Sequence, residues 1–271
     1  MSLIVLCWTL GMGPKVHSYQ VIPVPEGGVV AGKVYTRSPP PQVKKHPLLR
    51  FPNPEYCGQI SDGHNNRDLD EFFIDERGGL KNVVIAIEGI PSGKPFPPEA
   101  SSTSIRLCQL DPFVVVFWKP FSITVRNLDP LFHTLQGVQM ESSRRPALFY
   151  LPLQEGENRT IPFQFSRDRR IFTMHCGVHP FSQMWGFAVK NPYFDITKKN
   201  GSFRISEITP GSYTMSIWHP TMKVTTRPLT VRPSLETRID LELDIIQVDL
   251  PLPGLSELES KTPKEDNKNY Q

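Results

Sequence analysis

Residues 170–190 read Arg170-Ile-Phe-Thr-Met-His-Cys-Gly-Val-His-Pro-Phe-Ser-Gln-Met-Trp-Gly-Phe-Ala-Val-Lys190. The two apolar ends, 170–175 and 185–190, predict short strands, and the segment between them predicts a loop that carries sulfur and imidazole side chains. Alternating runs at 121–127 and 212–218 predict further strands. The chain has 28 Pro residues and no sustained 3.6-residue apolar period. The sequence therefore predicts an all-β protein.

The expected strands follow one another closely in the middle of the chain. They are 112–117, 121–127, 148–153, 160–165, 170–175 and 185–190. Seven or eight short strands at this spacing indicate a Greek-key β-sandwich. The first two are expected to pair as a hairpin. A second hairpin is expected over 194–205, because the Asn200-Gly201 pair favours the positive φ of a tight turn.

The loop after residue 175 places Cys176, His179 and Met184 in a C-x2-H-x4-M pattern, and His133 closes the upstream segment Asn127-Leu-Asp-Pro-Leu-Phe-His133. One thiolate, two imidazoles and one thioether form the donor set of a blue-copper site, with two His and one Cys around the metal and a long axial Met bond. The pattern predicts one copper ion on these four residues. The alternative is that they fill an apolar core, since free Cys is among the most buried residue types.

With these motifs the chain resembles the cupredoxins, and its loop has the spacing of the plastocyanin type. The stretch from Cys57 to Lys190 resembles a family of exported cupredoxin-like proteins. Its marks are Tyr56-Cys-Gly58, Gly79-Leu-Lys-Asn-Val-Val84, Cys108-Gln-Leu-Asp-Pro112, the two copper segments and Asn191-Pro-Tyr-Phe194. The resemblance implies a type 1 copper protein that carries single electrons between redox partners, such as a c-type cytochrome or an oxidase, and that is not an enzyme.

Residues around the four donors have expected roles as well. Asn127 and Asp129 are expected to make hydrogen bonds that fix the loop before His133, not to bind the metal. Four apolar neighbours are expected to exclude water and to offer a rim where a redox partner docks: Phe132, Pro180, Phe181 and Trp185. For Phe181 and Trp185, packing in the core is an equal alternative.

The chain start predicts export. Leu3 to Leu10 is apolar but too short to cross a bilayer, and Val16-His-Ser18 fits a cleavage site, so residues 1–18 are interpreted as a signal peptide. An uncleaved anchor is the alternative. The expected location is periplasmic or secreted. Removal of Cys7 would leave three cysteines, and this count, with the family resemblance, implies a Cys57–Cys108 disulfide and a Cys176 that is free for metal.

The C-terminal part is expected to form a second module. The segment from Phe194 to Pro220 contains T-x-x-x-G-x-F-x-I and P-G-x-Y-x-x-x-I-W-H-P patterns. These resemble the small carboxypeptidase-regulatory or transthyretin-like sandwich, which implies a structural or interaction domain. The predicted division is a cupredoxin-like domain at 19–190, this module at 191–248 and a disordered tail at 249–271.

Two other classes of function stay open. His175 directly precedes the copper Cys, as in copper nitrite reductases, and on a strand it would point to the opposite face and reach a second metal. Only His46, His64 and His219 remain as partners for such a site. The other possibility is a metal-free scaffold in an exported complex. A net charge of +3 predicts neither nucleic-acid binding nor strong binding to a membrane surface.

Overall fold

The computed structural model describes residues 19–40, 45–68, 72–140, 145–166, 169–220 and 222–245. Strands dominate the described chain, and its two helical elements are single turns, η1 (Leu48–Arg50) and α1 (Pro54–Cys57). The predicted all-β class is confirmed. The signal peptide expected at 1–18 and the tail expected at 249–271 lie outside the described residues. Within the described part, no helix is long and apolar enough to span a membrane.

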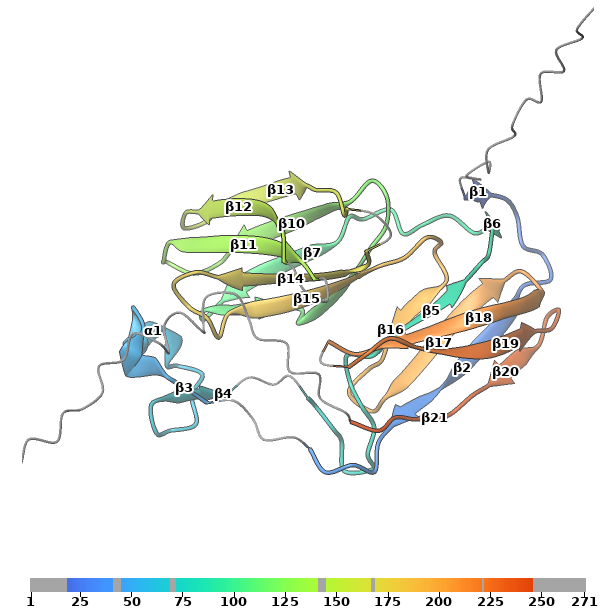
Figure 1. Ribbon diagram of the computed structural model, residues 1–271, viewed down its shortest axis with the longest axis horizontal. Helices are drawn as coiled ribbons and strands as arrows, with labels where there is room; N and C mark the ends of the chain where they lie inside the picture. Colours follow the sequence, from blue (N-terminus) through green and yellow to red (C-terminus); the bar gives the residue numbers. More distant parts are fainter. Residues whose placement is uncertain are drawn as a thin grey trace, which may run out of the picture.

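Two sheets form the first sandwich (Figure 1). The four-stranded sheet has the order β13 (Asn158–Pro162), β10 (Ser122–Asn127), β7 (Ser102–Arg106), β8 (Gln109–Asp111). The five-stranded sheet has the order β12 (Ala147–Leu153), β11 (His133–Gln139), β14 (Ile171–Cys176), β15 (Gln183–Ala188), β9 (Val114–Phe117). Ile123 and Val125 of β10 and Phe172 and Met174 of β14 belong to the buried core cluster of this sandwich.

A second sandwich also consists of two sheets. One of its sheets has the order β16 (Phe194–Ile196), β5 (Val84–Glu88), β18 (Gly211–Trp218), β19 (Thr225–Val231). The other has the order β17 (Ser202–Ile208), β2 (Gly28–Tyr35), β20 (Glu236–Arg238), and β21 (Leu241–Glu242) also pairs with β2. Alternate residues of β2 are buried, which fits a strand with one face on a core.

The strands that form the second sandwich do not follow the predicted division at 190/191. Strands β2 and β5 fall within the predicted first domain, yet β2 pairs with β17 and β5 pairs with β16 and β18. The second sandwich therefore draws strands from both ends of the chain. The alternation within a strand shows which face is buried but not which distant strand is its partner, so sequence pattern alone left β2 and β5 with their neighbours in the chain.

Both predicted hairpins are wrong in their pairing. Strand β9 pairs with β15, whereas β10 pairs with β7 and β13 in the opposite sheet. Strands β16 and β17 likewise join different sheets. The expected turn does form, with Gly201 at φ +75° and a hydrogen bond from Lys198 N–H to the Ser202 carbonyl. In both places a short connection carries the chain across the sandwich instead of along one sheet.

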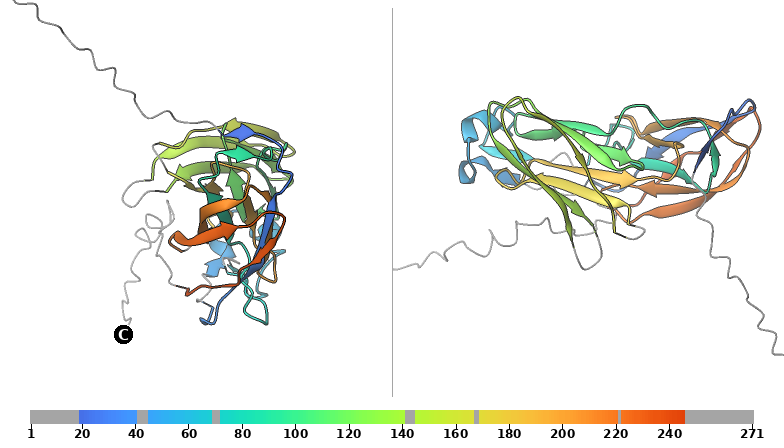
Figure 2. Two further views of the ribbon diagram at one scale, coloured as in Figure 1. Left: turned by 90° about the vertical axis from the view of Figure 1, so that its right-hand side faces the viewer. Right: turned by 90° about the horizontal axis from the view of Figure 1, so that it is seen from above.

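The two sandwiches share an apolar interface. All six residues of β15 are buried, because one face of this strand looks into the first core and the other meets the second sandwich. Phe187 of β15 stacks on Trp218 of β18 with ring centroids 5.1 Å apart. Val84 and Ala86 of β5 belong to the same cluster. Seen from above, the two sandwiches lie one beyond the other along the long axis (Figure 2).

Short elements complete the fold. Strand β1 (Gln20–Val21) pairs with β6 (Ser92–Gly93), and β3 (Lys45–Pro47) pairs with β4 (Asn66–Asp68). Strands β3 and β4 lie with η1 and α1 at the end of the first sandwich that is remote from the second sandwich (Figures 1 and 2). The predicted disulfide between Cys57 and Cys108 is confirmed, and it joins α1 to the turn between β7 and β8.

Candidate metal centre

Three of the four predicted ligands come together at this remote end. His133 is the first residue of β11, and Cys176 is the last residue of the neighbouring strand β14. His179 lies in the loop that leads from β14 to β15. One donor atom from each lies within 4.8 Å of the other two, and each of the three residues is at most 1% exposed.

Both imidazoles face the same sulfur. The Cys176 Sγ lies 3.6 Å from His133 Nδ1 and 3.8 Å from His179 Nδ1. The backbone N–H of Val178 also donates to this sulfur. Two equivalent ring nitrogens and one sulfur therefore converge without contact with solvent.

The outer nitrogen of each ring is occupied by a hydrogen-bond acceptor. His133 Nε2 lies 3.0 Å from Asp129 Oδ2, and His179 Nε2 lies 3.1 Å from the carbonyl oxygen of Pro52. A neutral imidazole that donates from Nε2 has its lone pair on Nδ1, which is the nitrogen directed at Cys176. The hydrogen bonds thus hold both rings in the orientation that a metal ligand needs, with Nδ1 facing the sulfur and free for a metal once its proton is lost, so the residues fit a metal of the copper or zinc class.

Met184, the fourth predicted ligand, lies on β15, the strand that neighbours β14. It is completely buried as the second residue of β15, and its register partner on β14 is Met174. It belongs to the same apolar cluster as Cys176. Its role as the weak axial ligand stays a prediction.

The electrostatics of the cluster favour a thiolate. Burial raises the pKa of the Cys176 thiol, but hydrogen bonds from His133, His179 and Val178 N–H more than offset this and lower it to about 6. Burial lowers the pKa of His133, whereas its hydrogen bonds to Asp129 and Cys176 raise it to about 9. These shifts favour a Cys176 thiolate beside a protonated His133, and metal binding would take the thiolate and release the ring proton.

Asn127 holds the loop before His133. Its Nδ2 donates to the carbonyls of Leu131 at 2.7 Å and Gln154 at 2.9 Å, and its Oδ1 accepts from Asp129 N–H at 3.0 Å. These bonds confirm the loop-fixing role predicted for Asn127. They also orient Asp129 toward the ring of His133.

The carboxylate of Asp129 accepts four hydrogen bonds. Its Oδ1 accepts from the Tyr56 hydroxyl at 2.9 Å and from Leu107 N–H at 2.6 Å. Its Oδ2 accepts from Cys108 N–H at 2.8 Å and from His133 Nε2. These hydrogen bonds lower the pKa of Asp129 although burial acts to raise it. The hydrogen bonds predicted for Asp129 are present, and one of them reaches the backbone of the disulfide residue Cys108.

The predicted apolar rim is only partly exposed. Phe132 is 45% exposed, but Phe181 is buried against Phe51, and Trp185 is buried between the two sandwiches. For Phe181 and Trp185 the alternative of core packing is therefore the one observed. Leu128, which the sequence did not single out, adds a side chain that is 52% exposed.

The sequence missed the part played by residues 45–68. Pro52 acts through its backbone carbonyl, for which no side chain gives a signal. Tyr56 stood in the family-like segment around Cys57, and the predicted Cys57–Cys108 disulfide could have placed it near Asp129.

Among the described residues, no cluster of metal ligands forms at His175, the alternative second site. This residue lies on the opposite face of β14 from Cys176, is buried, and has its pKa lowered by that burial. The three-ligand clusters found among the described residues do not include it. His219 stacks on Phe72, with ring centroids 4.6 Å apart, and His64 is exposed.

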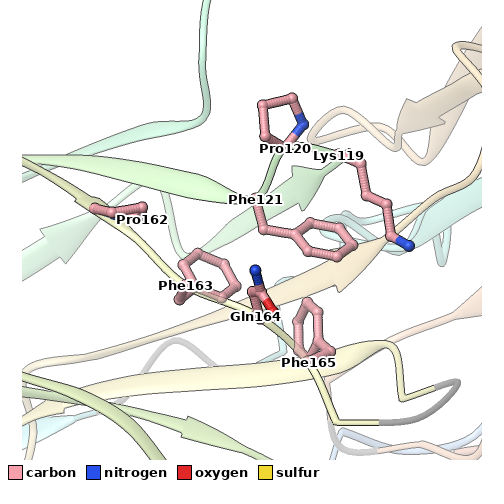
Figure 3. Close-up of a pocket in the computed structure, with 7 residues that line it drawn as sticks. All are labelled: Lys119, Pro120, Phe121, Pro162, Phe163, Gln164 and Phe165. Atoms are coloured by element: carbon pink, nitrogen blue, oxygen red, sulfur yellow. The ribbon is translucent and has the colours of Figure 1, made fainter.

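The opposite end of the first sandwich carries an apolar hollow of about 760 Å³ (Figure 3). Its lining residues precede β10 or lie at and after the end of β13: Lys119, Pro120, Phe121, Pro162, Phe163, Gln164 and Phe165. The six residues of β10 separate it from the loop before His133, which is roughly 20 Å at 3.3 Å per residue. The hollow is therefore not part of the metal centre.

No family model and no curated protein matches the chain. Similar solved structures include a purple cupredoxin from Nitrosopumilus maritimus, at 16% identity over 33% of this chain and 99% of that one. A Cu-containing nitrite reductase from Thermus scotoductus SA-01 shows 14% identity over 36% of this chain and 24% of that one. A reduced Cu(I) form of amicyanin shows 14% identity over 39% and 98%.

All three comparisons have a TM-score of 0.28. A likeness at that level is too weak to support a fold or a function for this chain. The chain also spans only about a quarter of the length of the nitrite reductase. These comparisons do not support the second module, so its resemblance to transthyretin-like sandwiches stays an expectation.

Proposed function

We propose that this protein binds one type 1 copper ion through His133, Cys176, His179 and Met184 and carries single electrons between exported redox proteins. One observation carries the proposal. Both Nδ1 atoms face the buried sulfur at 3.6 and 3.8 Å, while each Nε2 is directed outward to an acceptor. This arrangement supplies the thiolate and imidazole donors of a blue-copper site, oriented before any metal is bound.

The chain's own residues suit a carrier. A copper ion held by this donor set supplies a one-electron redox couple. Strands β11 and β14 fix the positions of His133 and Cys176, and the hydrogen bonds of Asp129 and Pro52 fix the ring orientations. Because neither the donors nor their partners need to move, little reorganisation accompanies a change of charge. Burial of all three donors also leaves no open position for a substrate, which favours a carrier over an enzyme.

Cu(II) titration of residues 19–271 tests the proposal. We expect an intense visible thiolate-to-copper band that is lost in Cys176→Ser and in His179→Gly, with the circular dichroism of the fold retained. His64→Gly is the matched control, because His64 is exposed and is absent from the three-ligand clusters. A colourless wild type that binds no copper would reject the carrier and favour a metal-free scaffold.

The remaining parts of the proposal concern location and partners. The protein is proposed to act in the periplasm or outside the cell, with a c-type cytochrome or an oxidase as redox partner. The Cys57–Cys108 disulfide supports an oxidising compartment. The second sandwich is proposed to serve as a structural or interaction module, joined to the first through β15.

A further inference from the structure

Residues 45–68, here called the cap, cover the metal centre. Pro52 accepts the hydrogen bond of His179, and Phe51 packs edge-on against Phe181 with ring centroids 5.7 Å apart. Leu48 and Cys57 of the cap share an apolar cluster with Phe181. The cap is therefore what completes the burial of His179, which is 0% exposed.

The disulfide joins the cap to the sandwich beside the ligands. Cys57 and Cys108 are both completely buried, with Cα atoms 5.3 Å apart. Their sulfurs lie within 4.8 Å of a ring nitrogen of His179. The Cys108 sulfur also lies within 4.8 Å of donor atoms of Asp129 and His133. The only disulfide among the described residues thus contacts the surroundings of both imidazoles.

Asp129 connects the cap, the turn that bears Cys108 and the metal centre. One carboxylate accepts from Tyr56 of the cap, from the backbone of Leu107 and Cys108, and from the ligand His133. Leu107 and Cys108 have φ values of +51° and +57°, a left-handed conformation that costs energy for residues other than Gly. The turn that bears Cys108 therefore depends on contacts that also orient His133.

Arg67 provides a non-covalent link across the disulfide. It is 3% exposed, and its guanidinium donates to the carbonyls of Cys57 at 2.8 Å and Leu107 at 3.0 Å. It also lies over the ring of Phe181 at 5.5 Å. These bonds would keep the Cys57 and Leu107 carbonyls near each other after the S–S bond is broken, so the cap would loosen without leaving the sandwich and the disulfide could form again.

We propose that the Cys57–Cys108 disulfide is a redox latch on the cap and that its state is coupled to metal binding at His133, Cys176 and His179. This inference rests on the proposed function for the identity of the metal centre. A dithiol reductant would transfer two electrons and two protons to the disulfide, giving two thiols and becoming a disulfide itself. With the latch closed the metal is held tightly and exchanges slowly, and with the latch open the ligands are accessible.

The coupling must be reciprocal. A metal on His179 fixes the ring that bonds to Pro52, so it holds the cap closed and keeps the two cysteines together. If closing the latch tightens metal binding tenfold, then metal binding makes the disulfide harder to reduce by about 30 mV. Equal factors measured in the two directions distinguish coupling from a simple loss of structure on reduction.

The first test uses metal-free protein. The alkylation rate of Cys176 by iodoacetamide is compared between the wild type and Cys57→Ala/Cys108→Ala, with Cys176→Ser as the blank. We expect at least a tenfold faster reaction in the double variant. Hydrogen exchange on the wild type, oxidised and dithiol-reduced, gives a second readout if the variant does not fold. Loss of protection should be confined to residues 45–68 and 106–109, and equal alkylation or unchanged exchange would overturn the latch.

The second test measures the coupling with Zn(II) as a redox-silent probe. Zinc affinity is measured in the oxidised and reduced protein, and the disulfide potential is measured in a dithiol buffer with and without zinc. We expect tighter binding to the oxidised form and a matching fall in potential. A rise in potential with zinc would mean that the released thiols bind the metal, which overturns the proposed direction. A third outcome is that neither zinc nor copper binds in either state, while reduction still exposes Cys176. This would reject the proposed function and the coupling, but it would retain the disulfide as the group that holds the cap closed.

Discussion

The two ends of the first sandwich are formed by the same strands but are closed in different ways. At the metal end, polar donors lie in the loops around His133 and Cys176, and the cap covers them. At the far end, Phe121 and Phe165 line a hollow and stay half-exposed. A buried polar group without a partner costs about 1–3 kcal/mol, whereas partly exposed apolar surface needs no partner. Polar chemistry inside a sandwich therefore needs a cover and a complete set of hydrogen bonds, and an aromatic end does not.

This difference predicts that stability and metal binding can be separated. Phe163→Ala at the far end should cost about 3–5 kcal/mol of unfolding free energy, because Phe163 is buried against the rings of Phe117, Phe121 and Phe172. Urea denaturation measures the loss. The affinity for Cu(II) and the visible band should stay unchanged in protein that remains folded. An altered band would show that the two ends are not independent.

At the metal end, Asp129→Asn should lower the unfolding free energy less than Phe163→Ala does, but it should weaken metal binding more. The amide replaces an oxygen that accepts hydrogen bonds by a nitrogen that donates, so His133 or the Cys108 turn loses a partner. We expect metal affinity to fall by about 10–100-fold, the usual range for residues that orient a ligand. A competition titration with Cu(II) measures this.

The matched control for Asp129→Asn is Asp195→Asn in the second sandwich. Asp195 also accepts from backbone N–H groups, those of Ile196 at 2.8 Å and Arg204 at 2.7 Å, but it touches none of the ligands. Its substitution should leave the metal affinity as it is. If both variants weaken binding to the same extent, Asp129 acts only through general stability.

The convergence of Cys176, His179 and His133 was predictable from sequence because the spacing is local. Cys176 and His179 are three residues apart, and an N-x-D-x-x-x-H segment delivers Asp129 and His133 together. The covering of the site was not predictable in the same way. The carbonyl of Pro52 is 127 residues away from His179 in the chain, and a backbone atom leaves no trace in residue type.

Strand pairing shows the same limit. All four residues of β9 are buried, so the run marks a strand but gives no face and no partner. Strand β9 pairs with β15, whose partner residues lie about 70 positions later, and not with the next strand in the chain. Elements and their burial follow from local pattern, whereas the choice of sheet depends on distant contacts that a single sequence does not reveal.

The smallest expected effect concerns the exposed surface around the metal end. Leu128 lies in the loop before His133 and is 52% exposed, and Leu235 in the second sandwich is 53% exposed. Leu128→Ala should change stability by less than about 0.5 kcal/mol, as is usual for a surface substitution, yet slow electron transfer to a soluble c-type cytochrome a few-fold. Leu235→Ala should leave that rate unchanged, because it lies away from the metal end. Stopped-flow kinetics on the copper-loaded protein compares the two variants. Equal rates in both variants would mean that the partner does not contact the loop carrying Leu128.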